Sequence, residues 1–569
     1  MCKTWFITVM LLLAVAILNP LMGQDTEEAK LQAIGEKYRY QSFSFDPVYA
    51  TEMGDYSPEY MYYPGYSKRS LKKQAAALKS IQKQLRKIKQ EKLSIDSRID
   101  YLLLQGNIRT NLLFLERSLL IRDNPKLFSS TAINGIYYLL ISPSLSDSLK
   151  LEYILSRLTD LPRFLTSARK SLKAPPLLWI LLSEKETETS LAFFNEVATH
   201  FTSQFPARQV EIEAAFTEVA TALEGFIDLL DVLKLEEHKS FAFGKENYNR
   251  LLREEHFLDF DADSLLHLGE IWLERAMTKY DSVKAICDTL PLTNGPTCFI
   301  PRSFSRADIL DYFQWEINQS RSWVQESHFA AVPPDIGDCI PVETPKFLRN
   351  IIGGIAYQPP GPFEPVQTGL FYVRPLPDSL DETSRSAFFR YAVKRGFKGS
   401  TVHEAYPGHH LQIQLANRHS SPIRRLQHNN MGMEGWALYC EETVYEHGFY
   451  GDDPRTYLGI LGGVLFRAAR IVVDVKLHTG QFTYQEAVDW MAAKLDASVG
   501  FIEIEVSRYT LNPTQPISYL VGKNLILEIH DLYRSRQGDA YSPQAFHDML
   551  LGNRSIPPVL IYKKLAGEI

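Results

Sequence analysis

Apolar residues in the first half of the chain recur at steps of three and four, which is the spacing of one helix face. The clearest run follows the turn at Tyr63-Pro64-Gly65-Tyr66 and contains Leu71, Leu78, Ile81, Leu85 and Ile88, with lysines and arginines between them. This pattern predicts an amphipathic helix with a solvated basic face. Contact of that face with an acidic membrane or partner is the alternative.

Further runs of this kind predict helices at 100–120, 147–171, 184–203, 210–234, 244–254 and 263–283. Prolines between the runs mark breaks or kinks. The spacing contains no consistent repeating unit. The first half is therefore predicted to be a helical wall that carries no chemistry of its own.

The pattern changes between residues 291 and 377, where proline and glycine are frequent and helical spacing is scarce. Within this region Gly369-Leu370-Phe371-Tyr372-Val373 is a short β-type run closed by prolines. In one interpretation this strand pairs with the extended backbone of a substrate. In the other it belongs to a small sheet that covers the core.

Helical spacing returns after Ser384 and predicts helices at 384–394, 402–417, 433–446, 458–478, 519–534 and 543–551. Thr483 and Glu486 form a capping box at the start of one more helix. We expect a mainly α fold with two lobes, at 24–290 and 291–569, and a small β-sheet beside the helix at 402–417.

The first 23 residues differ from the rest of the chain. Lys3 precedes an apolar run at 5–18, and Gly23 precedes a polar segment, which predicts a secretory signal peptide cleaved near Gly23. The run is shorter than the ~20 residues of a membrane span, which favours a signal peptide. An uncleaved N-terminal anchor is the alternative. Cys2 lies before the apolar run, unlike a lipid-attachment cysteine. We expect a periplasmic or secreted protein without a membrane span after cleavage.

A net charge of -6 over 569 residues argues against nucleic-acid binding. After cleavage four cysteines remain, Cys287, Cys298, Cys339 and Cys440. In an oxidising compartment they can pair in three ways, and a bond between Cys287 and Cys298 closes a short loop. None has the spacing of a thiolate metal site.

Imidazole and carboxylate side chains concentrate between Thr401 and Glu442. The common zinc motif places histidines at i and i+4 of a helix, with a glutamate beside the first. Here His403-Glu404 is followed at i+4 by Pro407, and the next histidines are His409 and His410. Because proline forces a kink or bulge, two looped-out residues bring His409 to the i+4 place. We favour His409 as the second ligand and keep His410 as the alternative.

Glu434, between two nearby glycines, is suited to close approach to an ion. The pattern therefore predicts a Zn²⁺ site formed by His403, His409 and Glu434, with Glu404 as the general base. Glu441 lies two helical turns beyond Glu434 and is placed to orient a ligand histidine. Ligands of these types also accept other divalent ions.

HEAYPGHHLQ followed by EGWALYCE resembles the bacterial family called domain of unknown function 885. GLFYVRP, SRYTLNPTQPISYLVGK and FHDMLLGNRSIPPVL resemble further segments of that family. The family in turn resembles the gluzincin metallopeptidases of the helical oligopeptidase and carboxypeptidase kind, whose third zinc ligand is a glutamate on the following helix. Gly408-His409-His410-Leu411-Gln412 is similar to the second half of their motif, which again favours His409. The residues inserted before Gly408 are a departure from it.

The resemblance implies a tyrosine or histidine from a later helix that hydrogen-bonds the tetrahedral intermediate. Tyr519 is the first candidate for this role and Tyr509 the weaker one, while Arg508 suits a substrate carboxylate. On the helix at 458–478, Arg470 and Asp474 are predicted to form an ion pair, and His478 to interact with the helix end.

The sequence thus predicts zinc-dependent hydrolysis of peptide bonds, and the resemblance implies short peptides as substrates. One alternative is a catalytically silent protein that binds a metal or a peptide. The other is a metallohydrolase that acts on a non-peptide amide or ester.

Overall fold

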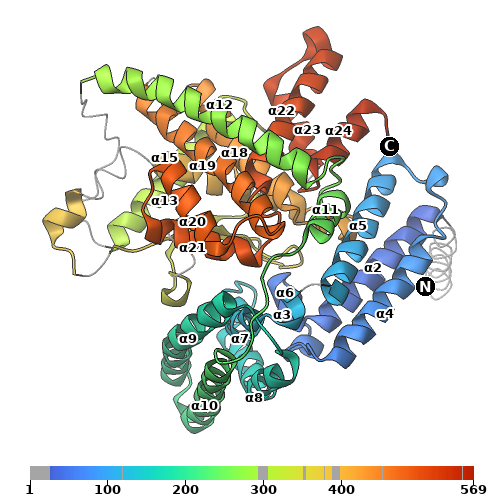
Figure 1. Ribbon diagram of the computed structural model, residues 1–569, viewed down its shortest axis with the longest axis vertical. Helices are drawn as coiled ribbons and strands as arrows, with labels where there is room; N and C mark the ends of the chain where they lie inside the picture. The colour runs from blue at the N-terminus through green and yellow to red at the C-terminus, as the bar shows by residue number, and fades with distance from the viewer. Residues whose placement is uncertain are drawn as a thin grey trace, which may run out of the picture.

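The computed structural model describes residues 26–117, 119–291, 306–349, 354–376, 379–387, 397–451, 453–553 and 555–569. Over these ranges the chain is mainly helical with one small sheet, which confirms the predicted mainly α fold (Figure 1). The predicted signal peptide, Cys298 and part of the predicted helix at 384–394 lie outside these ranges. None of the helices within them is long and apolar enough to cross a membrane.

Helices α2 to α10 form the N-terminal part of the molecule, coloured blue to green in Figure 1. Their bounds are α2 (Glu27–Phe45), α3 (Pro47–Glu52), α4 (Lys68–Leu85), α5 (Ile95–Arg117), α6 (Leu119–Arg122), α7 (Pro125–Leu140), α8 (Asp147–Ser171), α9 (Leu177–Gln204) and α10 (Gln209–Leu233), with short 3-10 helices at Pro58–Tyr60, Gln90–Lys92 and Pro206–Arg208. In α4 the predicted apolar stripe is buried and the lysines are exposed, as its amphipathic pattern indicates.

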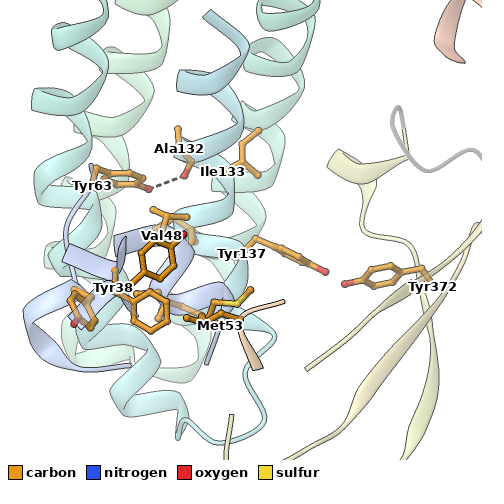
Figure 2. Close-up of a cluster of buried hydrophobic side chains, with 14 of the residues drawn as sticks. Tyr38, Val48, Met53, Tyr63, Ala132, Ile133, Tyr137 and Tyr372 are labelled. Carbon is orange, nitrogen blue, oxygen red and sulfur yellow. Dashed lines mark hydrogen bonds between the residues drawn. The ribbon is translucent and has the colours of Figure 1, made fainter. Parts of the chain in front are cut away.

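Buried aromatic and aliphatic side chains join these helices to the sheet. Figure 2 shows Tyr63, whose hydroxyl donates to the carbonyl of Ala132 at 2.8 Å. In the same view Tyr137 of α7 and Tyr372 of strand β3 (Gly369–Val373) point toward one another. One hydrophobic core therefore runs from the N-terminal helices into the sheet.

Helices α11 (Lys245–Glu254) and α12 (Ala262–Thr289) continue the chain, and α12 packs along α19 (Pro454–His478). The approach is close, because a Cβ on Gly269 would lie 2.6 Å from a side-chain carbon of Ile471. A helix before residue 290 thus packs against a helix after it. The division into lobes at residue 290 stays a prediction.

Helix α13 (Arg306–Glu326) corrects the expectation that residues 291–377 contain little helix. Its buried positions Ile309, Phe313, Ile317 and Val324 have the steps of four and seven residues that place side chains on one helix face. This spacing lies between the proline-rich stretches, whose composition dominated the prediction.

The sheet contains β1 (Cys339–Glu343), β2 (Ile355–Gln358) and β3, in the order β1-β3-β2. Strand β3 has the predicted bounds and pairs parallel with β1 and antiparallel with β2. Because both of its edges are occupied, the interpretation in which this strand pairs with a substrate backbone is wrong. The sheet lies beside the motif helices, since Tyr357 of β2 hydrogen-bonds His410.

The C-terminal part is again helical and coloured yellow to red in Figure 1. Its remaining helices are α15 (Phe397–Glu404), α16 (His409–Asn417), α17 (Pro422–Arg425), α18 (Asn430–Glu446), α20 (Tyr484–Leu495), α21 (Val499–Leu511), α22 (Ser518–Gln537), α23 (Pro543–Gly552) and α24 (Pro558–Ala566), with 3-10 helices at Lys346–Leu348 and Gly538–Ala540. The predicted capping box of Thr483 and Glu486 is present. The cysteines that the structure describes, Cys287, Cys339 and Cys440, are buried and form no disulfide with one another.

Helices α18 and α22 cross at two glycines. A Cβ on Gly522 would lie 2.2 Å from the carbonyl oxygen of Met431 and 2.8 Å from the Cα of Gly435. Only glycine permits this approach. The crossing brings together the helices that carry Glu434 and Tyr519.

Candidate metal centre

The motif segment is two helices joined by a loop rather than the predicted helix at 402–417. Helix α15 ends at Glu404 and α16 begins at His409, and the amide of Gly408 donates to the carbonyl of Val402 at 3.0 Å. Pro407 lies in this loop, at the place where its missing N–H predicts a break. A Cβ on Gly408 would lie 1.9 Å from the carbonyl oxygen of His403, so the loop requires glycine there.

The loop places His409 beside His403, and α18 supplies Glu434. One ligand atom from each of the three side chains lies within 4.8 Å of the other two. The Glu434 Oε2 atom is 3.5 Å from His403 Nε2 and 3.3 Å from His409 Nε2. Ligands at 2.0–2.2 Å in a tetrahedral arrangement are about 3.4 Å apart, so these distances match a shared zinc ion.

The hydrogen bonding of this cluster leaves room for an ion. Glu434 Oε2 and His409 Nδ1 are buried and have no hydrogen-bond partner among the described residues. Burial lowers the pKa of His403, but the nearby carboxylates Glu434 and Glu441 outweigh it and raise that pKa to about 10. The same histidines hold the pKa of Glu434 well below its usual range, against the effect of burial. A metal ion bound here would replace the proton on His403 Nε2, and the unpartnered Oε2 atom of Glu434 would become one of its ligands.

Glu441 fixes the orientation of His403. Its Oε1 atom lies 2.8 Å from His403 Nδ1, the predicted contact, and 3.6 Å from Arg467 Nη2. When Nε2 is deprotonated, a proton held on Nδ1 by Glu441 leaves the lone pair of Nε2 directed at the cluster. Burial raises the pKa of the Glu441 carboxyl, but Arg467 and His403 outweigh burial and lower that pKa, so the carboxylate stays charged.

His410 faces the other way. Its Nδ1 atom is 2.9 Å from the hydroxyl of Tyr357, and its Nε2 atom is 2.9 Å from the carbonyl oxygen of Gly337. Burial lowers the pKa of this side chain to about 4, so it is neutral. One ring nitrogen thus contacts strand β2 and the other contacts the segment just before β1. The structure brings His409 rather than His410 to Glu434.

Glu404 is the last residue of α15 and stays partly exposed beside the cluster. Burial raises the pKa of its carboxyl and outweighs the charges of His403 and His409, which act to lower that pKa. A carboxylate next to a metal ligand, with access to solvent, is in position to exchange a proton with water.

Tyr519 also lies at the cluster, with its ring stacked 6.5 Å from that of His403. Its hydroxyl accepts a hydrogen bond from Gln515 Nε2 at 3.3 Å, which leaves its own proton available. The guanidinium groups of Arg467 and Arg470 lie 5.4 and 4.8 Å from the ring centroid.

Tyr509 and Arg508 lie beside Glu505 rather than beside the histidines. The Tyr509 hydroxyl donates to Glu505 Oε2 at 2.7 Å, and Arg508 Nη2 lies 3.0 Å from the same oxygen. Burial raises the pKa of Glu505, but Arg470 and Arg508 lower it to about 2. Sequence reasoning missed Glu505, although its i,i+3 and i,i+4 spacing to Arg508 and Tyr509 was a readable signal.

Two lesser expectations for α19 are corrected by this arrangement. Arg470 Nη2 binds Glu505 at 2.7 Å, while Asp474 accepts from Tyr248 at 2.6 Å and from the amide of Thr514 at 3.0 Å. Arg470 and Asp474 form no ion pair with each other, because Arg470 binds Glu505 of α21 and Asp474 binds Tyr248 of α11. His478 binds the carbonyl oxygen of Tyr509 at 3.0 Å and so joins two helices instead of closing its own.

Fold and centre together define a class: a mainly helical protein in which two histidines and a glutamate from three helices meet in a buried cluster. The chain belongs to the family of bacterial proteins of unknown function DUF885, whose model matches residues 47–565. The resemblance seen in the motif segments is therefore confirmed at the level of the family.

Two solved structures share the fold. A proposed lipoprotein of unknown function from Shewanella oneidensis is 19% identical, covers 94% of this chain and 99% of its own, and superposes with a TM-score of 0.75. A proposed lipoprotein from Colwellia psychrerythraea is 20% identical, covers 95% and 99%, and gives a TM-score of 0.77. No protein with a curated description matches this sequence. The resemblance to gluzincin metallopeptidases stays a prediction.

Proposed function

We propose that this protein is an exported zinc-dependent peptidase with a two-lobed, gluzincin-like architecture. The observation that carries the proposal is the distance of Glu434 Oε2 from the two imidazoles, 3.3 Å to His409 and 3.5 Å to His403. His403, His409 and Glu434 are a donor set that suits Zn²⁺, and they leave a fourth position for water or substrate.

The roles of the side chains follow from their positions. Zinc held by this donor set would supply a Lewis acid for a carbonyl oxygen and would make a water molecule more acidic. Glu404 takes a proton from the attacking water and passes it to the leaving amine. The Tyr519 hydroxyl, which accepts from Gln515, donates its own proton to the oxyanion.

Arg508 and Tyr509 are assigned to substrate binding in unequal parts. The Arg508 side chain is 30% exposed and suits a substrate carboxylate. Tyr509 is fully buried, so it acts by holding Glu505 and through it Arg508.

Export is supported by two observations. The first 23 residues have the pattern of a signal peptide, and both structural neighbours are described as proposed lipoproteins. An N-terminal anchor that is never cleaved is the alternative, and N-terminal sequencing of the protein from its native host distinguishes the two.

The decisive experiment combines metal analysis with a mixed library of short peptides read by mass spectrometry. We expect one zinc per chain in both the wild type and Glu404→Gln, and cleavage only by the wild type. A chelator should abolish cleavage and added zinc should restore it. Equal zinc with no cleavage by either protein would favour a silent binding protein, and hydrolysis of esters alone would favour the non-peptide alternative.

Adjacent histidines provide a matched pair of variants for the ligand assignment. His409→Ala removes a donor, so we expect it to lose zinc while its fold persists. His410→Gln keeps a hydrogen-bonding group near Tyr357 and Gly337, so we expect it to retain zinc. Loss of zinc from the second variant alone would refute the assignment.

A further inference from the structure

A cavity of about 610 Å³ lies where the N-terminal helices meet the C-terminal part of the chain. One side is formed mainly by residues of α2, α3, α5 and α7, and the other by residues 426–430, 511–513 and 515. Its volume lies within the ~300–1,000 Å³ typical of small-molecule sites. Segments far apart in the sequence therefore enclose a space large enough for several residues of a peptide.

Three carboxyl groups lie on the lining of this cavity. Asp46, Glu52 and Glu255 lie on it, and it contains no lysine or arginine. Each of the three carboxylates is partly exposed, although the helices around them are packed. Its histidine, His428, is neutral, because burial lowers the pKa of that side chain to about 4. The cavity thus holds carboxylates without a cation among its described lining residues.

Burial makes this charge costly. It raises the pKa of Glu52 and of Glu255 to about 7, and for Glu52 a hydrogen bond with Tyr138 only partly opposes the effect. Carboxylates in such a place are normally paired with a cation. Asp46 already accepts from the amide of Tyr49 and interacts with the charge of Arg157, so Glu52 and Glu255 are the carboxylates to which a positively charged ligand would supply a partner.

The remaining lining indicates an organic cation rather than a bare metal ion. Six aromatic rings and a set of side-chain amides surround the carboxylates: Tyr38, Phe45, Tyr49, Tyr66, Phe114 and Tyr138, with Asn107, Asn111, Asn134 and Asn512. Aromatic faces attract ammonium groups, and amide oxygens accept their hydrogen bonds.

The cavity shares a wall with the candidate metal centre. Gln515 lines it and donates to the hydroxyl of Tyr519 at 3.3 Å. Asn429, also on the lining, caps the helix that carries Glu434. A molecule bound in the cavity therefore lies next to the elements that position the proposed catalytic groups.

We propose that this cavity binds the ammonium-bearing part of a peptide substrate, either its N-terminal amine or a lysine side chain. The inference rests on the proposed peptidase function, and it makes cationic peptides the preferred substrate class.

The test uses the full chain with Glu404→Gln, so that bound peptide is not cleaved. Four peptides with Ala-Ala-Ala after the first residue are titrated by calorimetry: lysine or norleucine in first place, each with a free or an acetylated N-terminus. We expect the acetylated norleucine peptide to bind at least about tenfold more weakly than the best ammonium peptide. The free norleucine and acetylated lysine peptides show which ammonium is bound.

The cavity variants locate the effect. Glu52→Gln and Glu255→Gln, each added to Glu404→Gln, should reduce the preference for the ammonium peptides, while Glu59→Gln, an exposed carboxylate seven residues from Glu52, should leave it intact. Melting temperatures show whether each variant folds.

Equal binding of the acetylated norleucine peptide to the Glu404→Gln chain overturns the inference, and this measurement needs no cavity variant. An ammonium preference that survives both Glu52→Gln and Glu255→Gln also overturns it. Failure of the peptidase proposal would give a different result, namely an intact ammonium preference with no cleavage by the wild type.

Discussion

At the scale of single residues, the orientation of His403 depends on Glu441. The carboxylate accepts from Nδ1 at 2.8 Å and is itself next to Arg467. Glu441→Gln should lower zinc affinity by roughly 10- to 100-fold, because the amide no longer holds the imidazole by a charged hydrogen bond. Competition with a chelating dye measures this.

The neighbouring carboxylate is the control for Glu441. Glu442 pairs with Lys523 and Lys279, and within the described residues it makes no hydrogen bond or ion pair with the histidines of the cluster. We expect Glu442→Gln to leave zinc affinity unchanged. Equal losses from the two variants would mean that the effect of Glu441 is general to the helix rather than specific to His403.

The two candidate tyrosines make a second prediction at this scale. Tyr519→Phe should lower kcat by roughly 10²- to 10³-fold with zinc retained, since it removes a donor to the oxyanion. Tyr509→Phe should instead cost about 1–3 kcal/mol of stability, because it removes the buried hydroxyl that donates to Glu505 alongside Arg470 and Arg508. Steady-state kinetics and urea denaturation distinguish them, and a larger kcat loss for Tyr509→Phe would reverse the assignment.

Residue types and spacing were enough to predict which side chains form the cluster, because a proline and a glycine between the histidines predict a loop. The surroundings of Tyr509 were not predictable in this way. Its hydroxyl faces Glu505 on the same helix, and Arg470 from α19 joins them. The spacing of residues along one helix does not predict a partner that comes from another helix.

At the scale of elements, the crossing of α18 and α22 sets the distance between Glu434, the proposed metal ligand, and Tyr519, the proposed oxyanion donor. Gly522→Ala places a Cβ 2.2 Å from the carbonyl oxygen of Met431. We expect a loss of about 1–3 kcal/mol, together with lower activity, because the helices must separate. Denaturation and peptide cleavage are both measured.

Gly459 offers the control, since it lies in α19 and a Cβ there meets nothing within 4 Å. Gly459→Ala should stabilise the protein by about 0.5–1 kcal/mol, the usual gain from alanine in a helix. Similar losses from both glycines would argue against a specific role for the crossing.

Local patterns identified most elements but not their neighbours. The run Gly369–Val373 was sufficient to predict β3, and nothing in it indicates a central place, which depends on β1 and β2. Helix α13 was overlooked because the prolines on either side of it outweighed its apolar spacing. Strand order and packing partners are properties of the folded chain.

At the scale of the whole molecule, a buried ion pair joins the N-terminal helices to the segment after the motif. Arg424 of α17 donates to Asp100 of α5, and only 2% and 6% of the two side chains are exposed. Arg424→Met should lower the free energy of unfolding by about 3–5 kcal/mol, because Asp100 is left as an unpaired buried charge. Urea denaturation followed by circular dichroism measures it.

A surface pair serves as the comparison. Arg418 binds Asp335 at 2.9 Å, with 30% and 77% of the side chains exposed. Arg418→Met should therefore cost no more than about 1 kcal/mol. Comparable losses from the two arginines would mean that the buried pair adds little to the joining of these parts.

The proposed metal donors come from three separate helices, α15, α16 and α18, so an ion bound by them would recognise the native chain far better than the denatured one. Binding that is confined to the native state adds about 4 kcal/mol of stability when free zinc exceeds the dissociation constant a thousandfold. Chelation should therefore lower the melting temperature, and scanning calorimetry across a zinc titration reports the occupancy of the centre without any substrate.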